Sequence, residues 1–141
     1  MCFPLLGKAQ SLQVCPQCPI STIAQAVAIA KKGDTIEVQK GTYPENNILL
    51  DKPLTLIGKG MPVINGQFKG SILKIQADSV TIKGFRLANV PFKATEEQAA
   101  ILLDKSKKFL IEDNIMDQVC FGVLLRKGRD GIIKNNKISS N

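Results

Sequence analysis

The amino-acid sequence predicts an all-β fold, a right-handed parallel β-helix of four to five coils preceded by a short capping α-helix. The first observation is a repeated phrase: the segment 80–87 recurs at 109–116 and 131–138, and more loosely at 54–58. One apolar position of the phrase recurs at intervals of 26, 29 and 22 residues, as Leu56, Ile82, Ile111 and Ile133. Intervals of about 20 to 50 residues are typical of solenoids, in which a coil has no core until its neighbour stacks on it.

The second observation is an apolar pair, spaced by two residues, before each copy of the phrase. The pairs are Ile48 and Leu50, Leu73 and Ile75, Ile101 and Leu103, and Val123 and Leu125. Spacing by two is strand periodicity, so each coil is expected to contain a short strand, a bend, a second short strand and a turn. The third observation is that Asn114 and Asn136 share one position, where a side chain can hydrogen-bond to the next coil and the backbone can turn left-handed.

Composition limits both the fold and the chemistry. With 141 residues the chain is expected to be one domain, and with 44% hydrophobic but only 5% aromatic residues its core must be aliphatic. The absence of His excludes Ser-His-Asp and Cys-His catalysis and imidazole metal sites. The net charge of +7 is scattered rather than clustered, which argues against a nucleic-acid interface. No apolar run reaches the roughly 18 residues of a membrane span.

Residues 1–19 are expected to be an N-terminal tail. The apolar piece at residues 2–6 fits either the remnant of a signal peptide or a disordered terminus. The tail also contains a Cys-x-x-Cys motif, Cys15 to Cys18, which could form a small disulfide that pins the first coil or provide two thiolates for copper(I). The other soft ligands are Met61, Met116 and Cys120, although Met116 and Cys120 fit core positions as well.

Residues 20–141 are expected to form the capping helix and the coils. The helix should begin after Ser21 as N-cap and end at Gly33, with the apolar stripe Ile23, Ala24, Val27, Ala28 and Ala30. Such a helix would act as a lid on the open edge of the first coil. The first strand follows within residues 34–43, and residues 91–98 form a longer polar excursion between coils.

A column of outward-facing cations is the strongest candidate for a substrate or partner surface. It contains Lys52, Lys105 and Lys127, interrupted by Ala77 and accompanied by Asp104 and Arg126. Such a column could track an anionic polysaccharide, or it could be a solvated face on which Asp104 and Arg126 pair across adjacent coils. The carboxylates of Asp51 and Asp104 are expected about 10 Å apart without an enclosing cleft, so no catalytic residue is assigned.

Several phrases in one order resemble a known family. They are Gly33-Asp34-Thr35-Ile36, Gly41-Thr42-Tyr43-Pro44-Glu45, Asp51-Lys52-Pro53-Leu54-Thr55-Leu56-Ile57-Gly58, Pro62-Val63-Ile64-Asn65-Gly66 and Val80-Thr81-Ile82-Lys83-Gly84-Phe85. Together with the early Cys pair they resemble the N-terminal part of NosD, a family of periplasmic, pectin-lyase-like β-helix accessory proteins that mature the copper sites of nitrous oxide reductase. Family members are longer, so the chain is expected to be an N-terminal fragment.

Three functions follow from these observations. The resemblance implies a non-enzymatic periplasmic protein that binds or delivers copper, with the reductase and a membrane ABC transporter as partners. The cationic column favours the alternative of a lyase, hydrolase or epimerase acting on an anionic polysaccharide. A structural surface solenoid is the third alternative.

Overall fold

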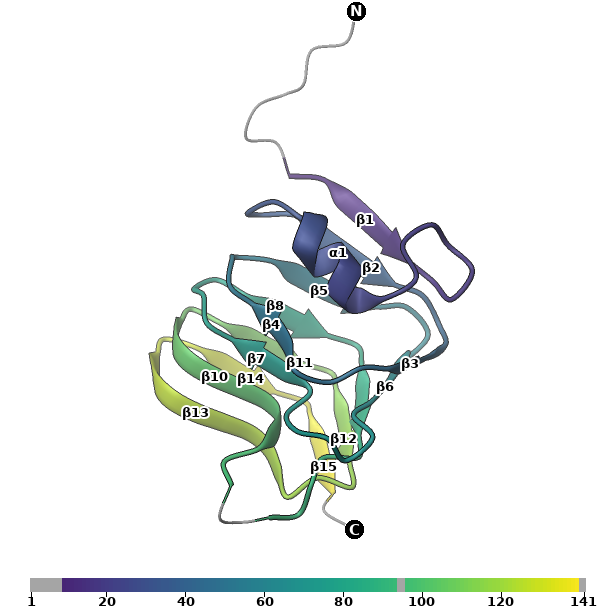
Figure 1. Ribbon diagram of the computed structural model, residues 1–141. Helices are drawn as coiled ribbons and strands as arrows, with labels where there is room; N and C mark the ends of the chain where they lie inside the picture. The colour runs from purple at the N-terminus through teal and green to yellow at the C-terminus, as the bar shows by residue number, and fades with distance from the viewer. Residues whose placement is uncertain (1–8, 94–95, 140–141) are drawn as a thin grey trace, which may run out of the picture.

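The structure, a computed structural model, describes residues 9–93 and 96–139, which form a parallel β-helix of about six turns with one short helix at the N-terminal end (Figure 1). The apolar piece at residues 2–6 lies outside this range. The fold prediction is confirmed. The number of turns exceeds the four to five expected, because residues 11–14, assigned to the tail, form a strand that pairs with the first predicted one.

Three parallel sheets form the walls of the solenoid, so each complete turn contributes three strands rather than the two expected. The first sheet contains, in spatial order, β1 (Ser11–Val14), β2 (Thr35–Val38), β5 (Thr55–Gly58), β8 (Thr81–Lys83), β11 (Leu110–Glu112) and β14 (Ile132–Lys134). The second contains β4 (Ile48–Leu50), β7 (Leu73–Ile75), β10 (Ala99–Lys107) and β13 (Phe121–Arg129). The third contains β3 (Thr42–Pro44), β6 (Val63–Asn65), β9 (Arg86–Ala88), β12 (Ile115–Asp117) and β15 (Lys137–Ser139).

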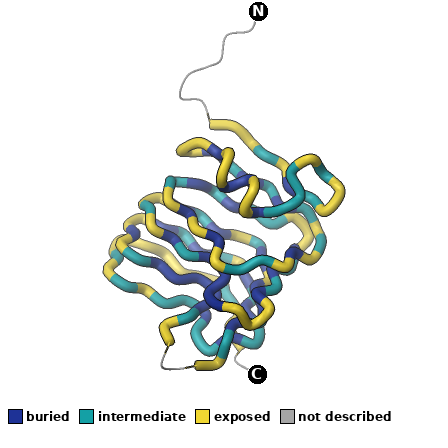
Figure 2. The backbone as a smooth tube through the Cα atoms, viewed as in Figure 1, coloured by how far each residue is buried: buried dark blue, intermediate teal, exposed yellow. Residues whose placement is uncertain are grey.

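The predicted apolar column is one continuous file inside the solenoid. Strand register places Leu56 beside Ile82, Ile82 beside Ile111, and Ile111 beside Ile133. The first three have no exposed surface, whereas Ile133 is 47% exposed because no described turn lies beyond it. Figure 2 shows buried positions alternating with more exposed ones along the turns. Burial of an inward side chain therefore depends on a cover on both sides, which is another turn or, at the N-terminal end, the helix segment.

The capping helix α1 (Ile23–Ile29) is shorter than expected. Thr22, rather than Ser21, is the N-cap: its side chain accepts a hydrogen bond from the Gln25 backbone N–H in a capping box, and the helix ends at Ala30 before it reaches Gly33. The buried face contains Ile23, Ala26 and Val27 of the helix and Ala30 at its C-cap. This i, i+3, i+4, i+7 stripe leaves the predicted Ala24 and Ala28 exposed. The part of the chain that the structure describes contains no helix long and apolar enough to span a membrane.

Two charged side chains of the first full turn clamp the helix at its ends. Glu45 accepts hydrogen bonds from the backbone N–H groups of Ile23 and Ala24, at 2.8 and 3.0 Å. Lys52 donates to the carbonyl oxygens of Val27 and Ala30 at the other end. An anion at the N-terminus and a cation at the C-terminus both match the helix dipole. The helix thus lies against β4, the terminal strand of the second sheet, in place of a further strand (Figure 1).

Asp34 fastens the lid to the first sheet. Its buried carboxylate accepts hydrogen bonds from the backbone N–H groups of Lys31, at 2.8 Å, and Gln10, at 2.9 Å. These two bonds, in that order, lower the pKa of Asp34 against the opposing effect of burial. The ionised carboxylate therefore joins the end of the helix segment to the entry of β1.

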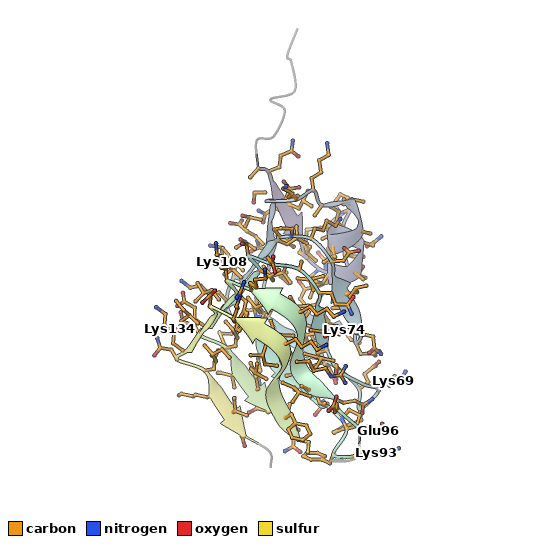
Figure 3. All side chains as sticks on the ribbon, turned by 90° about the vertical axis from the view of Figure 1, so that its left-hand side faces the viewer. Lys69, Lys74, Lys93, Glu96, Lys108 and Lys134 are labelled. Carbon is orange, nitrogen blue, oxygen red and sulfur yellow. A yellow bond between two sulfur atoms is a disulfide. The ribbon has the colours of Figure 1, made fainter. Side chains whose placement is uncertain are left out.

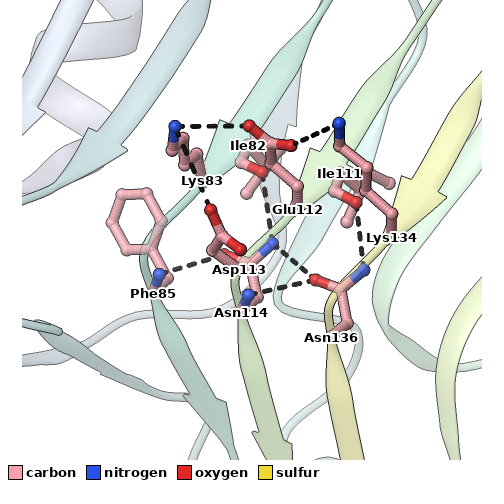
Figure 4. A network of polar contacts seen from close by, with 9 residues as sticks. All are labelled: Ile82, Lys83, Phe85, Ile111, Glu112, Asp113, Asn114, Lys134 and Asn136. Carbon is pink, nitrogen blue, oxygen red and sulfur yellow. Dashed lines mark hydrogen bonds and ion pairs between the residues drawn. The ribbon is translucent and has the colours of Figure 1, made fainter.

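A ladder of asparagine side chains joins two adjacent turns of the solenoid, as predicted for Asn114 and Asn136 (Figure 4). Asn114 is buried; its Oδ1 accepts from the Phe85 N–H at 3.0 Å and its Nδ2 donates to the Ile82 carbonyl at 3.1 Å. The left-handed residues are not the ladder residues themselves but those just before them, such as Asp113 at φ 58°. The backbone bends one residue earlier, which turns the amide inward.

We predict that Asn114→Ala lowers the free energy of unfolding by about 3 kcal/mol, because it removes the side-chain partner of the buried Phe85 N–H and the hydrogen bond to the Ile82 carbonyl. Urea denaturation measures the change. Asn46→Ala, at a partly buried site whose side-chain contact is to the adjacent Asn47, serves as control and should cost less than about 0.5 kcal/mol. Equal free energies of unfolding for the two variants would contradict a stabilising role of the asparagine ladder.

We further predict that stability gained from Asp34 depends on pH. Because its pKa is lowered on folding, its contribution is complete above the ordinary value of 3.8 and is lost as the pH falls through the folded value. Asp34→Asn should therefore cost about 2 kcal/mol near neutral pH and less below pH 3.8. Urea unfolding at both pH values tests this, with the exposed Asp51→Asn as control. A cost independent of pH would refute the assignment.

Candidate functional site

The Cys-x-x-Cys motif forms a disulfide at the N-terminal end of the solenoid. Cys15 and Cys18 are bonded, with Cα atoms 5.0 Å apart, and the Cys18 N–H donates to the Cys15 carbonyl at 3.1 Å in a tight turn. Pro16 in this loop lies over Gly41, where an added Cβ would come within 3.0 Å of the proline ring. The loop thus covers the backbone just before β3, the first strand of the third sheet. This is the structural alternative raised by the sequence, and in the oxidised state neither sulfur is a thiolate.

The other sulfur-containing side chains considered as copper ligands lie outside the Cys15–Cys18 loop. Met116 is fully buried in β12 between Leu87 and Ile138, as its repeat position predicted. Its turn is four turns from that of β1, or roughly 19 Å at the spacing of hydrogen-bonded strands. Met61 is 38% exposed at a left-handed turn, and Cys120, expected to be buried, is a half-buried free thiol. Within residues 9–93 and 96–139, no three His, Cys, Asp or Glu side chains are grouped to hold a metal.

Strand register aligns the residues of the cationic column, but their side chains fall into two groups. Leu50, Ile75, Leu103 and Leu125 are neighbours across the second sheet, which places Lys52, Ala77, Lys105 and Lys127 two residues further along in one column. The Lys52 ammonium is turned to the carbonyl groups of α1, so it is a helix anchor. Lys105 and Lys127 instead line a common hollow of about 260 Å³.

The expected ion pair between Asp104 and Arg126 does not form, although the two residues are neighbours in register. The Arg126 guanidinium pairs with Glu97, from the polar excursion at residues 91–98, which reaches across to it. Arg126 Nε is buried and has no hydrogen-bond partner among the described residues. The prediction failed because strand register says nothing about a side chain that arrives from a loop.

Lys107 and Arg129 complete the hollow, and the sequence reasoning missed them. They lie directly beside each other in register, two residues after Lys105 and Lys127. Period-two spacing along a strand was the available signal, since it puts such residues on one face. The hollow therefore contains four cationic side chains from two adjacent turns.

A second hollow, of about 330 Å³, lies between α1 and β4. Its polar lining includes Asn46, Asn47, Asp51 and Lys52. Asp104 lies two turns from Asp51, with Gln76 between them in the column. The two carboxylates considered for sugar chemistry therefore do not share this hollow.

The fold and these features define the class of the molecule: a parallel β-helix with a helical lid, a disulfide loop at its N-terminal end and a cationic hollow on its second sheet. No protein-family model matches the chain, and no match was found among curated proteins or among solved structures.

Because the Lys52 ammonium is committed to the helix, we predict that Lys52→Met loosens the lid. Amide hydrogen exchange within α1 should become at least about fivefold faster, since loss of one charge-assisted anchor corresponds to roughly 1 kcal/mol. Lys74→Met, at a half-buried lysine of β7 on the same sheet, should leave the exchange of α1 unchanged. Equal protection of α1 in both variants would contradict the anchor role.

Proposed function

We propose that this chain is a non-catalytic accessory module for the assembly of the copper sites of nitrous oxide reductase, and that it works in the periplasm. The proposal rests on the ordered phrases that resemble NosD and on one structural feature, the Cys15–Cys18 loop. A disulfide is the state expected of such a pair in an oxidising compartment. The partners implied are the reductase and a membrane ABC transporter.

The loop supports a role in handling copper after reduction. A dithiol donor would supply two electrons, be oxidised to its own disulfide and leave Cys15 and Cys18 as thiols. With their Cα atoms 5.0 Å apart, both sulfurs can reach a single ion. Thiolates are the ligands that copper(I) prefers, and their deprotonation on binding releases two protons. Copper(I) is then cargo that the pair holds and passes on.

The sequence phrases that carry the resemblance contain residues that stabilise the fold. Asp34, Glu45 and Lys52, one from each of the first three phrases, all hold the helical lid in place. They account for a shared architecture, whereas the Cys pair is the part of the chain with chemistry suited to copper. The function proposed therefore depends on the loop.

We predict that the reduced protein binds one copper(I) ion through Cys15 and Cys18. Anaerobic competition titration, with a reductant that does not bind copper, should show about 100-fold weaker binding for Cys15→Ser/Cys18→Ser, because both thiolates of the loop are lost. Cys120→Ser removes a thiol outside the loop and should bind as the wild type does. Unchanged affinity in the double variant would remove copper from the proposed function.

A further inference from the structure

On the first and third sheets, oppositely charged side chains of neighbouring turns form ion pairs. The Glu112 carboxylate lies 3.3 Å from the Lys83 ammonium in the turn before it and 3.4 Å from the Lys134 ammonium in the turn after it (Figure 4). The bond from Lys83, followed by that from Lys134, lowers the pKa of Glu112. In the third sheet, Arg86 pairs diagonally with Asp117 of the next turn. Opposite charges thus meet across neighbouring turns in both of these sheets.

The pair of strands β10 and β13 breaks this pattern. Lys107 lies directly beside Arg129, and the flanking register brings Lys105 beside Lys127. Lys105 and Lys127 also share a left-handed backbone, at φ 58° and 51°. Like charges directly opposite each other in a sheet are destabilising. Two such pairs in succession require an explanation.

Nearby acidic groups leave these cations largely uncompensated. The Asp78 carboxylate is used by the Lys107 backbone N–H, at 3.0 Å. Asp130 lies 3.9 Å from Arg129 Nε, and both side chains are mostly exposed, so this pair is weak. Lys105, Lys107 and Lys127 form no ion pair within 4.0 Å inside the described ranges 9–93 and 96–139.

The four cationic residues line one open hollow. The hollow of about 260 Å³ has Gly128 in its lining. A Cβ at Gly128 would lie 2.5 Å from Leu125 Cδ1 and 2.6 Å from the Ser106 carbonyl oxygen, so the packing excludes a side chain there. Gly128 therefore contributes no side chain to the lining of the hollow.

We propose that this hollow binds a compact, multiply charged oxyanion of the phosphate class, as free phosphate or as a phosphate monoester. The ammonium groups of Lys105, Lys107 and Lys127 provide point charges, and the Arg129 guanidinium provides a fork of donors for two oxygens. A dianion offsets the repulsion within both pairs at once. The hollow is large enough for such a group, and none of its lining residues belongs to the Cys15–Cys18 loop.

Isothermal titration of the whole chain with inorganic phosphate, against sodium chloride of equal ionic strength, tests the proposal. Phosphate should bind, and Lys105→Gln/Lys127→Gln should weaken it at least about tenfold. Lys69→Gln, at an exposed lysine, serves as the control and should bind phosphate as the wild type does. Figure 3 shows Lys69 on the other side of the ribbon from Lys108, which directly follows Lys107 of the hollow. Glycerol phosphate in a parallel titration distinguishes an ester from free phosphate, and tighter binding of either supports the proposal.

Thermal unfolding keeps the test independent of folding defects. The double variant, freed of one like-charge pair, should melt in chloride at no lower temperature than the wild type, yet gain less from phosphate. If chloride and phosphate raised the melting temperature equally, the effect would be general charge screening rather than binding, and the proposal would be overturned. Equal loss in Lys69→Gln would do the same. Binding of polygalacturonate without any response to phosphate would overturn it in favour of an extended acidic polymer.

Discussion

Every turn of this solenoid depends on its neighbours to bury its inward side chains. Ile82 has Leu56 on one side and Ile111 on the other and is fully buried, whereas Ile133, with one neighbouring turn, is half exposed. The N-terminal end meets the same requirement with a helix and a disulfide loop in place of further strands. Glu45 and Lys52 hold that helix from the turn it covers, so the lid and the first full turn stabilise each other.

Stacking also decides the chemistry of the outer surface. Residues at one repeat position become neighbours about 4.8 Å apart. A column of charged residues therefore either alternates in sign or accumulates charge of one sign. The column of Lys83, Glu112 and Lys134 alternates and is satisfied within the protein. The pairs of β10 and β13 accumulate positive charge around a hollow, which is the arrangement expected of a binding site rather than of a structural contact.

The features predicted from the sequence are ones that recur in the repeated phrase, although Lys107 and Arg129, which also recur, were missed. The apolar file and the neighbouring Asn114 and Asn136 were foreseeable because each recurs at one position of the repeated phrase. The strand at residues 11–14 was missed because it precedes the first copy and is separated from it by the helix. The pairing of Arg126 with Glu97 depends on the path of a loop, and the anchoring of Lys52 depends on the position of a helix, so neither follows from strand periodicity.

The central claim is that inward aliphatic side chains stack turn over turn in one file. Nuclear Overhauser contacts between methyl groups, measured with Leu and Ile methyl labelling, test it directly. The account predicts cross-peaks from Ile82 to both Leu56 and Ile111, residues 26 and 29 positions away along the chain. Ile82 methyl groups that contact neither residue would contradict the architecture and, with it, the placement of the cationic hollow.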